Sequence, residues 1–412
     1  MHGKVPLATV TLCLGSRLFQ KQLAMKLQSL GMLRRVISFG VELEIFDPGG
    51  TEHLKLIHRF KHYRFANRIL WGVWRRLPGT GGRRNFPVVL SVSAADYLAS
   101  RWVPFSNVFH GCTGVCLASI QAAKRHGSVT LIENATMHPG AWQKAVLEEC
   151  NTFGVPARDC RAHLPSPLIK RMEREYDLCD YIIVPSRLAQ QSFETAGHKE
   201  KAIIVHAGVD HLFFAPSTAP REDGAFRVCY VGRIELAKGV PYILQAWNQL
   251  RLVNAELILV GEIAKEMNGL IKRYELPNVR FTGMLSTAKV AECYRSSDLF
   301  VFPSVNEGLA RVLFEAMSSG LPVVATDSSG AEDCVTNGVD GVIVPARSAD
   351  ALASAILWQY QNREAGAAMG RAAREKIEQR FTLSHYEERM VSIYRSAAQR
   401  RYRSNDPVVL ST

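Results

Sequence analysis

Short apolar runs alternate with amphipathic helical patterns along most of this chain. In its second half, an apolar run at 299–302 leads into a helical pattern that begins at Gly308, and a second Val-rich run ends at Asp327. Apolar runs of this length, separated by helical patterns, are typical of strands in a parallel sheet that is buried on both faces. We therefore predict a strand, a helix and a strand from Leu299 to Asp327.

The same alternation covers both halves of the chain. In the first half it predicts a helix at 18–30 and strands at 8–14, 35–39, 87–93, 107–110, 128–133 and 181–184. In the second half it adds strands at 226–231, 255–260, 279–283 and 341–345. Strands that alternate with helices favour an α/β class with a parallel sheet in each half.

The length indicates two domains. A chain of 412 residues exceeds what one hydrophobic core usually supports. Pro216, Pro220 and Gly224 mark a hinge between the halves. We expect one Rossmann-like domain at 1–207 and a second at 208–382, facing each other across a cleft.

Ligands of open parallel sheets bind beyond the carboxyl ends of the strands. Glu307 and Gly308 follow the strand at 299–302 and stand at the expected amino end of a helix, which suits an anionic ligand. Glu315 follows eight residues later, about 12 Å further along a helix axis. Two carboxylates at this spacing can hold the hydroxylated ends of one long ligand, with backbone N–H groups facing a phosphate between them.

Ionisable residues follow other strands at the same edge. Arg233 and Lys238 come after the strand at 226–231, where they can neutralise a diphosphate, although two cations in one loop are usually surface charge. His110 and His138 follow strands of the first half. A lone histidine at such a place is more often a hydrogen-bonded structural group than a catalytic one, and both interpretations stay open for His110.

Three stretches together resemble glycosyltransferase family 4, whose members are retaining nucleotide-sugar transferases of GT-B fold. Glu307 and Glu315 have seven residues between them, as in the Glu-x7-Glu signature of that family. VGRIELAKG at 231–239 and HAGVDHLFFAP at 206–216 match the family as well. The resemblance implies two Rossmann-like domains, with a terminal helix near 381–394 that crosses back to the first domain together with the tail up to residue 412.

The resemblance also implies roles for individual residues. Arg233 and Lys238 neutralise the leaving diphosphate, Glu307 holds sugar hydroxyls, Glu315 holds the ribose, and His138 lies near the reaction centre. The implied catalytic residues are His138, Arg233, Lys238 and Glu307. The implied donor-binding residues are Gly15, Gly232, Arg233, Lys238, Gly283, Glu307, Gly308, Leu309, Ala310 and Glu315, and the acceptor-side candidates are His110 and Glu133.

The sequence departs from the family at two places. Members commonly carry a glycine pair in the first loop, where only Gly15 stands here. Their commonest form after the first Glu is Gly-Phe-Gly, whereas this chain has Gly308, Leu309 and Ala310. The methyl group of Ala310 lies where backbone approaches the sugar, so we expect it to narrow the choice of donor.

The positive charge is concentrated in the first half. Residues 1–205 hold 27 Lys plus Arg against 15 Asp plus Glu, and this excess of +12 equals the net charge of the whole chain. No acidic residue occurs between Glu52 and Asp96, where nine Lys and Arg lie at 55–84 among aromatic residues. Two interpretations stay open, a solvated surface or a patch that meets anionic lipid headgroups or a lipid-linked acceptor. Nucleic acid is disfavoured, because no nucleic-acid-binding motif accompanies the charge.

Neither a metal site nor a cofactor is expected. The nine cysteines include no Cys-x-x-Cys pair, and no Asp-x-Asp occurs. Their irregular spacing suggests a reducing compartment, where cysteines pack as small apolar residues. No apolar run is long enough to span a membrane.

These observations predict a metal-independent, retaining glycosyltransferase. It would move a sugar from a nucleoside-diphosphate sugar to a saccharide or lipid-linked hydroxyl, in polysaccharide or glycolipid assembly, and would be cytoplasmic or peripheral at the inner face of a membrane. A GT-B epimerase or hydrolase and a non-catalytic GT-B subunit are the alternatives, and the charged residues of both motifs argue against them. An NAD-binding role is the weakest, since neither first-strand loop carries Gly-x-Gly-x-x-Gly.

Overall fold

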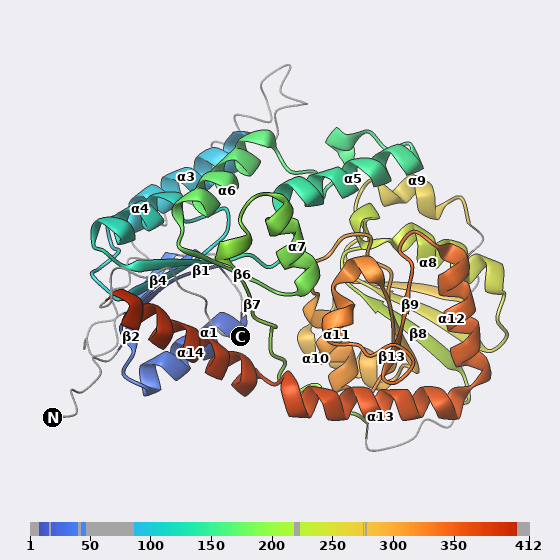
Figure 1. Ribbon diagram of the computed structural model, residues 1–412. Coiled ribbons are helices and arrows are strands. Elements are labelled where there is room, and N and C mark those ends of the chain that lie inside the picture. Colours follow the sequence, from blue (N-terminus) through green and yellow to red (C-terminus); the bar gives the residue numbers. More distant parts are fainter. Residues whose placement is uncertain are drawn as a thin grey trace.

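The computed structural model describes residues 8–15, 18–39, 43–46, 86–217, 223–274, 276 and 278–401. Within them, two β-sheets carry helices on both faces and form two lobes that lie side by side (Figure 1). We call the sheet built from the first half of the chain, with its helices, the first lobe, and the other the second lobe. The basic segment at 55–84 and part of the expected hinge, at 218–222, lie outside the described residues.

The first lobe has a seven-stranded sheet in the order β3-β2-β1-β4-β5-β6-β7. All neighbouring strands are parallel except β2 and β3. The strands are β1 (Val10–Gly15), β2 (Leu33–Phe39), β3 (Leu43–Phe46), β4 (Val108–Cys112), β5 (Val129–Glu133), β6 (Tyr181–Val184) and β7 (Ala202–Ile204). Since β7 is the last strand of this order, it forms an edge of the sheet.

Helices cover both faces of the first sheet. One face packs against α1 (Leu18–Ser29) and α14 (Leu383–Arg401), whose apolar residues share a core with β1, β4 and β5. The other face carries α3 (Phe86–Ser100), α4 (Leu117–Arg125), α6 (Ser166–Leu178) and α7 (Arg187–Thr195). Figure 1 shows α3, α4 and α6 above the sheet and α1 and α14 below it.

The strand predicted at 87–93 is wrong, because this segment belongs to helix α3. A short apolar run fits a strand or a buried helix equally well, and tertiary contacts decide between them. Asp96 is fully buried and accepts hydrogen bonds from the backbone N–H groups of Ala118 and Ser119 at the start of α4. It also pairs with Arg171 of α6. These contacts tie α3 to two neighbouring helices.

The second lobe has a six-stranded, fully parallel sheet in the order β10-β9-β8-β11-β12-β13. Its strands are β8 (Phe226–Val231), β9 (Ala255–Val260), β10 (Val279–Gly283), β11 (Leu299–Phe302), β12 (Val323–Thr326) and β13 (Gly341–Val344). Its helices are α8 (Val240–Leu250), α9 (Met267–Ile271), α10 (Thr287–Arg295), α11 (Arg311–Ser318), α12 (Ala349–Gln361) and α13 (Arg363–Arg380). All the strands predicted in this half are confirmed.

Three helices, α13, α14 and α5 (Pro139–Phe153), connect the lobes. In Figure 1, α13 runs along the lower edge of the second lobe and leads into α14 beneath the first sheet. The returning terminal helix is therefore confirmed, although it ends at Arg401 instead of near residue 394. Helix α5 packs against the core of the second lobe, with Trp142 and Val146 among its buried residues.

Two further sequence predictions concern the whole chain. Eight of the nine cysteines are buried and Cys112 is half-buried, all with free thiols, so the expectation that they pack as apolar residues is confirmed. Among the described helices, none combines the length and the apolar character that crossing a membrane requires.

Candidate functional site

Three loops of the second lobe meet at the carboxyl ends of β8, β11 and β12. The backbone N–H of Val305 and the hydroxyl of Ser304 both donate to the carbonyl oxygen of Ala237, at 3.3 and 3.2 Å. The backbone N–H of Glu307 donates to the carbonyl oxygen of Ser328 at 3.0 Å. The loop after β11 is therefore fastened to the loops on both sides of it.

Glu307 to Ala310 lie in a loop, so the prediction that the helix begins at Gly308 is wrong. Helix α11 begins at Arg311, and Ala310 before it has extended dihedral angles of −81° and 132°. Leu309 is buried, which draws the chain inward before the helix starts. The predicted separation of Glu307 and Glu315 along a single helix axis is therefore also wrong.

Lys238 and Glu307 form an ion pair between two of these loops. Lys238 ends a short 3-10 helix, η4 (Leu236–Lys238), and the next residue, Gly239, has a positive φ of 66°. A Cβ atom on Gly239 would lie 1.8 Å from the carbonyl oxygen of Pro303, so only glycine permits this approach. The side chains of Lys238 and Glu307 are only 15% and 7% exposed, which places both charges in a largely water-excluded site.

Burial alters the protonation equilibrium of Lys238. It lowers the pKa of this amine to about 8, while nearby Glu235 raises the pKa and Arg233 lowers it. The amine also lies 5.7 Å from the centre of the Trp142 ring, which belongs to α5. The loop after β8 and helix α5 therefore both contribute to the surroundings of Lys238.

Glu235 is a residue of this site that the sequence did not single out. Its carboxylate is fully buried and lies 3.4 Å from the guanidinium of Arg233. Within the described part of the chain, neither carboxylate oxygen has a hydrogen-bond partner. This carboxylate therefore lies beside Arg233 and raises the pKa of Lys238. The one hint of this role in the sequence is that Glu235 is an acidic residue between Arg233 and Lys238.

Gly308 touches the first lobe. A Cβ atom here would lie 2.7 Å from Cγ of Pro185 and 2.9 Å from Cα of Thr136. The hydroxyl of Ser186, which caps the start of α7, donates to the carbonyl oxygen of Gly308. The loop after β11 is thus one of the places where the two lobes are in close contact.

Glu315 lies on α11, in a separate environment. The hydroxyl of Tyr294 donates to its carboxylate at 3.4 Å. Burial raises the pKa of Glu315, while Arg311, one helical turn earlier, and the bond from Tyr294 lower it. Glu315 therefore does not share partners with the pair of Lys238 and Glu307.

The remaining donor-side candidates lie at strand ends. Gly232 follows β8, Gly283 ends β10, and Gly15 ends β1 in the first sheet. The backbone N–H of Gly261, which follows β9, donates to the carbonyl oxygen of Gly283 at 3.0 Å. The strand-end glycines of the second sheet are thus adjacent along its edge.

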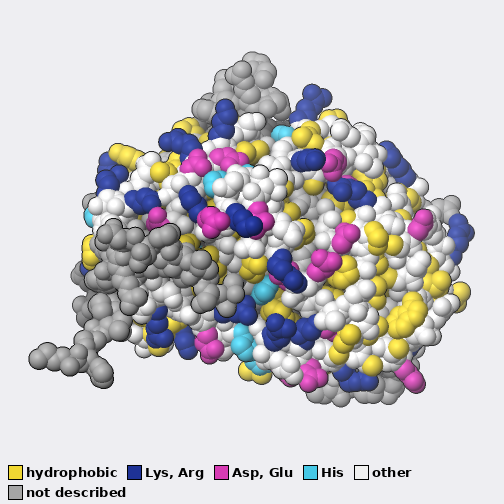
Figure 2. All heavy atoms as spheres, in the orientation of Figure 1, with side chains coloured by type: hydrophobic (Ala, Val, Ile, Leu, Met, Phe, Trp, Pro, Cys, Tyr) yellow, Lys and Arg dark blue, Asp and Glu magenta, His cyan; other side chains and the backbone are white. Residues whose placement is uncertain are grey.

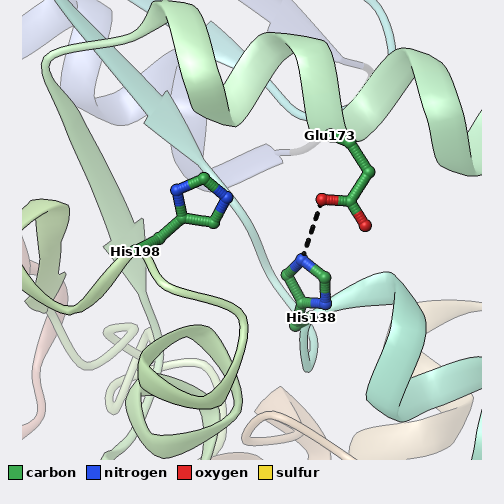
Figure 3. A group of neighbouring side chains, drawn as sticks. All are labelled: His138, Glu173 and His198. Atoms are coloured by element: carbon green, nitrogen blue, oxygen red, sulfur yellow. Dashed lines mark hydrogen bonds and ion pairs between the residues drawn. The ribbon is translucent and has the colours of Figure 1, made fainter.

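His138 caps helix α5 and is 6% exposed. Its Nδ1 accepts a hydrogen bond from the backbone N–H of Gly140 at 3.2 Å, so its Nε2 carries the proton in the neutral ring. Figure 3 shows this Nε2 pointing at the carboxylate of Glu173, at 3.3 Å. Burial lowers the pKa of His138; Glu173 raises it and His198 lowers it.

His138, Glu173 and His198 are also a group of side chains that could hold a metal ion. Their ligand atoms lie within 4.8 Å of one another (Figure 3). A metal at Nε2 of His138 would move the ring proton to Nδ1, where it would oppose the Gly140 N–H. The hydrogen bonds of His138 therefore favour its role as the cap of α5 over a role as a metal ligand. The expectation that the protein uses no metal stays a prediction.

The prediction that His110 ends its strand is wrong. His110 lies within β4, is 1% exposed, and has its Nδ1 2.7 Å from the hydroxyl of Tyr394 on α14. Burial lowers its pKa to about 4, so the ring is neutral at pH 7. Its Nε2 lies 3.8 Å from the carboxylate of Glu133, at the end of β5. These contacts favour a structural role for His110.

The structure therefore brings together some candidates and separates others. Arg233, Lys238, Glu307 and Gly308 lie on neighbouring loops, together with Glu235. His138 caps the helix that carries Trp142 to Lys238, but the hydrogen bonds of its side chain and backbone N–H are with Ser192, Glu173 and Gly140. Glu133 lies with Leu309 and Arg311 around a small cavity of about 40 Å³ between the lobes.

Comparison with known families gives one matching model, "Glycosyl transferases group 1", over residues 216–376. The putative colanic acid biosynthesis glycosyltransferase WcaL of Escherichia coli (strain K12) is 28% identical over 195 residues, 44% of this chain and 48% of that protein. The alpha-maltose-1-phosphate synthase of Mycolicibacterium smegmatis is 31% identical over 231 residues, 48% of this chain and 58% of that protein. The chain spans about half the length of the curated relatives it matches.

Solved structures match over nearly the whole chain. The sucrose-phosphate synthase from Thermosynechococcus elongatus has a TM-score of 0.65 at 19% identity and covers 94% of this chain and 98% of its own. Anabaena Alr3699/HepE, in complex with UDP-glucose, has a TM-score of 0.64 at 16% identity and covers 94% and 99%. At these identities the likeness concerns the fold, and it confirms the predicted GT-B arrangement of two lobes.

Proposed function

Because the chain belongs to the glycosyl transferases group 1 family, glycosyltransferase family 4, we propose that it transfers a sugar from a nucleoside-diphosphate sugar to an acceptor hydroxyl with retention at the anomeric carbon. The observation that carries this proposal is the buried pair of Lys238 and Glu307 beside Arg233, on loops at the carboxyl ends of β8 and β11. Cations at such an edge can stabilise the charge that develops on a departing diphosphate.

We propose the following roles for the residues at this edge. The diphosphate takes Lys238 as its counter-charge, with Arg233 as the second cation, and Glu307 is then released to accept hydrogen bonds from the donor sugar. Glu235 keeps Arg233 oriented and does not touch the substrate. Glu315 accepts from the ribose hydroxyls, and the loop that begins at Gly283 lies under the base.

No side-chain nucleophile is assigned in this proposal. The acceptor hydroxyl attacks from the face on which the diphosphate leaves, and the departing phosphate takes its proton. One C–O bond breaks at the anomeric carbon and one forms there, so no oxidant is required, and we propose that Lys238 and Arg233 act in place of a divalent metal at the diphosphate. We propose that the acceptor approaches from the first lobe, near Thr136 and His138.

The experiment that tests this function is a panel of nucleoside-diphosphate sugars, scored for slow donor hydrolysis and for transfer to added acceptors. UDP-glucose comes first, because HepE, which shares the fold, is solved with it. At least one donor should be turned over, equally with and without EDTA. Loss of turnover in EDTA would contradict metal independence, and no turnover of any donor would contradict the transferase itself.

The pKa of Lys238 leads to a pH prediction. The protonated amine is the form that neutralises a phosphate, so UDP affinity should fall as the pH rises through about 8. The fall should approach tenfold per pH unit above pH 9, which calorimetry from pH 6.5 to 9.5 can follow. Lys238→Met should bind weakly at every pH, and a wild-type profile that stays flat would contradict the assignment.

His138 should matter for transfer more than for nucleotide binding. His138→Ala removes both the cap of α5 and the Nε2 group, whereas His138→Asn keeps a capping oxygen and removes only Nε2. We expect both variants to lose at least about tenfold in transfer rate, with UDP affinity unchanged by calorimetry. If His138→Asn restored full transfer, His138 would be a cap alone.

We also propose where in the cell this protein acts. Relatives include proteins named for colanic acid and capsular polysaccharide biosynthesis, and we propose that this chain glycosylates a saccharide or lipid-linked acceptor in the cytoplasm, at the inner face of a membrane. Four of the nine cations at 55–84 would supply about 4 kcal/mol at an anionic surface.

Co-sedimentation with vesicles checks this membrane prediction. Binding should require anionic lipid, weaken with added salt, and weaken further when Arg59, Arg64, Arg68 and Arg75 become Gln. Equal recovery with neutral and anionic vesicles would instead support a soluble acceptor.

A further inference from the structure

A second cavity lies at the junction of the two lobes, and its lining shares no residue with the candidate donor site. Its volume is about 490 Å³, within the range of small-molecule pockets. Its walls are the edge strand β7, the start of α7, the end of α13, the middle of α14, and the 3-10 helix η6 (Ala331–Asp333) of the second lobe. Figure 2 shows Lys, Arg and His side chains gathered near the junction of the lobes on this face.

The charges around this cavity are unbalanced. Arg187, Arg380 and Arg389 line it, and Asp333 is the only carboxylate among its lining residues. Arg187 already shares that carboxylate, with its Nε 3.3 Å from Asp333. In the described part of the chain, Arg380 and Arg389 have no carboxylate within 4 Å.

Asp333 is fully occupied by partners around it. It is 4% exposed and accepts hydrogen bonds from the backbone N–H of Arg187 at 3.1 Å and from Nε2 of His206 at 2.9 Å. Burial raises its pKa, but the bonds from His206 and Arg187 outweigh this and hold the pKa below its usual value. Arg389 donates to Nδ1 of His206 at 3.1 Å, which leaves Nε2 of His206 to donate to Asp333. The carboxylate therefore offsets one guanidinium and leaves two positive charges facing the cavity.

Apolar and hydroxyl groups complete the lining. Ile203, Val205 and Ile393 form an apolar wall between β7 and α14. Arg389, Ser392 and Ser396 lie at spacings of three and four residues on one face of α14, so the two hydroxyls can donate beside the guanidinium.

We propose that this cavity binds a phosphate monoester that carries an apolar group. The fork of an Arg guanidinium matches phosphate oxygens, and two uncompensated guanidinium groups match the two charges of a phosphate monoester. The apolar wall accepts the substituent, which inorganic phosphate lacks. A free metabolite and a lipid headgroup such as phosphatidic acid share this chemistry.

The bound phosphate would also connect the lobes. Arg187 and Arg389 belong to helices of the first lobe, and Arg380 ends α13 of the second. Arg187 directly follows Ser186, which bonds to Gly308 across the junction. If the proposed transferase function holds, the bound phosphate favours this contact and raises the transfer rate.

Calorimetry with phenyl phosphate tests the site without any sugar donor. Phenyl phosphate should bind saturably, and inorganic phosphate at least tenfold more weakly. Arg380→Gln and Arg389→Gln should each weaken the binding of phenyl phosphate at least tenfold, with unchanged melting temperatures. Arg371→Gln is the matched control, since Arg371 is an exposed residue of the same helix as Arg380 and does not line the cavity.

Vesicles distinguish the two sources of the phosphate. Phosphatidylcholine vesicles with and without phosphatidic acid are compared, and binding that requires phosphatidic acid and falls in Arg380→Gln but not in Arg371→Gln supports a lipid headgroup. Binding of phenyl phosphate without such vesicle binding supports a free metabolite. Equal phenyl phosphate affinity in Arg380→Gln and Arg371→Gln, or no saturable binding, overturns the site even where sugar transfer is normal.

Discussion

Replacing Lys238 by alanine should lower kcat/KM for sugar transfer at least about a hundredfold. The loss of one preorganised charge that contacts a leaving group costs a few kcal/mol in the transition state. Lys238 is the least exposed cation of the site, and a water-excluded charge acts on a phosphate more strongly than an exposed one. The measurement is steady-state transfer with the best donor of the panel.

Two controls separate this effect from damage to the fold. Lys265→Ala removes an exposed lysine of the same lobe and should leave kcat/KM unchanged. Lys238→Ala also leaves the buried carboxylate of Glu307 without its cation, which destabilises the protein. The double variant Lys238→Ala with Glu307→Gln removes that uncompensated charge, so it should regain melting temperature, and its kcat/KM should stay well below that of Glu307→Gln alone. Near-normal turnover in Lys238→Ala would refute the phosphate role.

The second lobe could be predicted from the sequence because four of its six strands are almost entirely buried. The strands β8, β9, β11 and β12 are mainly apolar and almost entirely buried, and such runs have few alternatives once helical patterns separate them. The short edge strands β3 and β7 were missed, since three or four residues carry too weak a pattern. Helix α3 was mistaken for a strand because the carboxylate contacts of Asp96 come from segments that lie far away in the sequence.

Part of the candidate site could also be predicted from the sequence. Arg233, Lys238 and Glu307 follow strands, and parallel strands bring their carboxyl ends to one edge. Glu235 was missed because its importance comes from complete burial, which a loop sequence does not reveal. The bond from Ser186 to Gly308 depends on how the two lobes dock, and no local pattern encodes that docking.

Adding one methyl group at Gly308 should separate transfer from nucleotide binding. In Gly308→Ala, the new Cβ would lie 2.7 Å from Pro185 Cγ, 2.9 Å from Thr136 Cα and 3.0 Å from the Ala135 carbonyl oxygen. Two of these atoms are backbone, so the lobes themselves must move apart. The backbone of Gly308 does not have a positive φ, and the substitution therefore tests crowding without backbone strain.

We expect Gly308→Ala to lose about a hundredfold in transfer, because a displacement near 1 Å between reacting groups has an effect of that size. UDP affinity should change less than about threefold, since every crowded atom belongs to the first lobe, whereas the proposed nucleotide contacts lie in the second. Gly269→Ala is the matched control, a helical glycine with no atom within 4 Å of its added Cβ, and it should keep full activity. If Gly308→Ala were as active as Gly269→Ala, the close contact between the lobes would not be part of the catalytic arrangement. If it lost UDP affinity instead, the loop after β11 would serve the donor alone, and the acceptor would have to be held elsewhere on the first lobe.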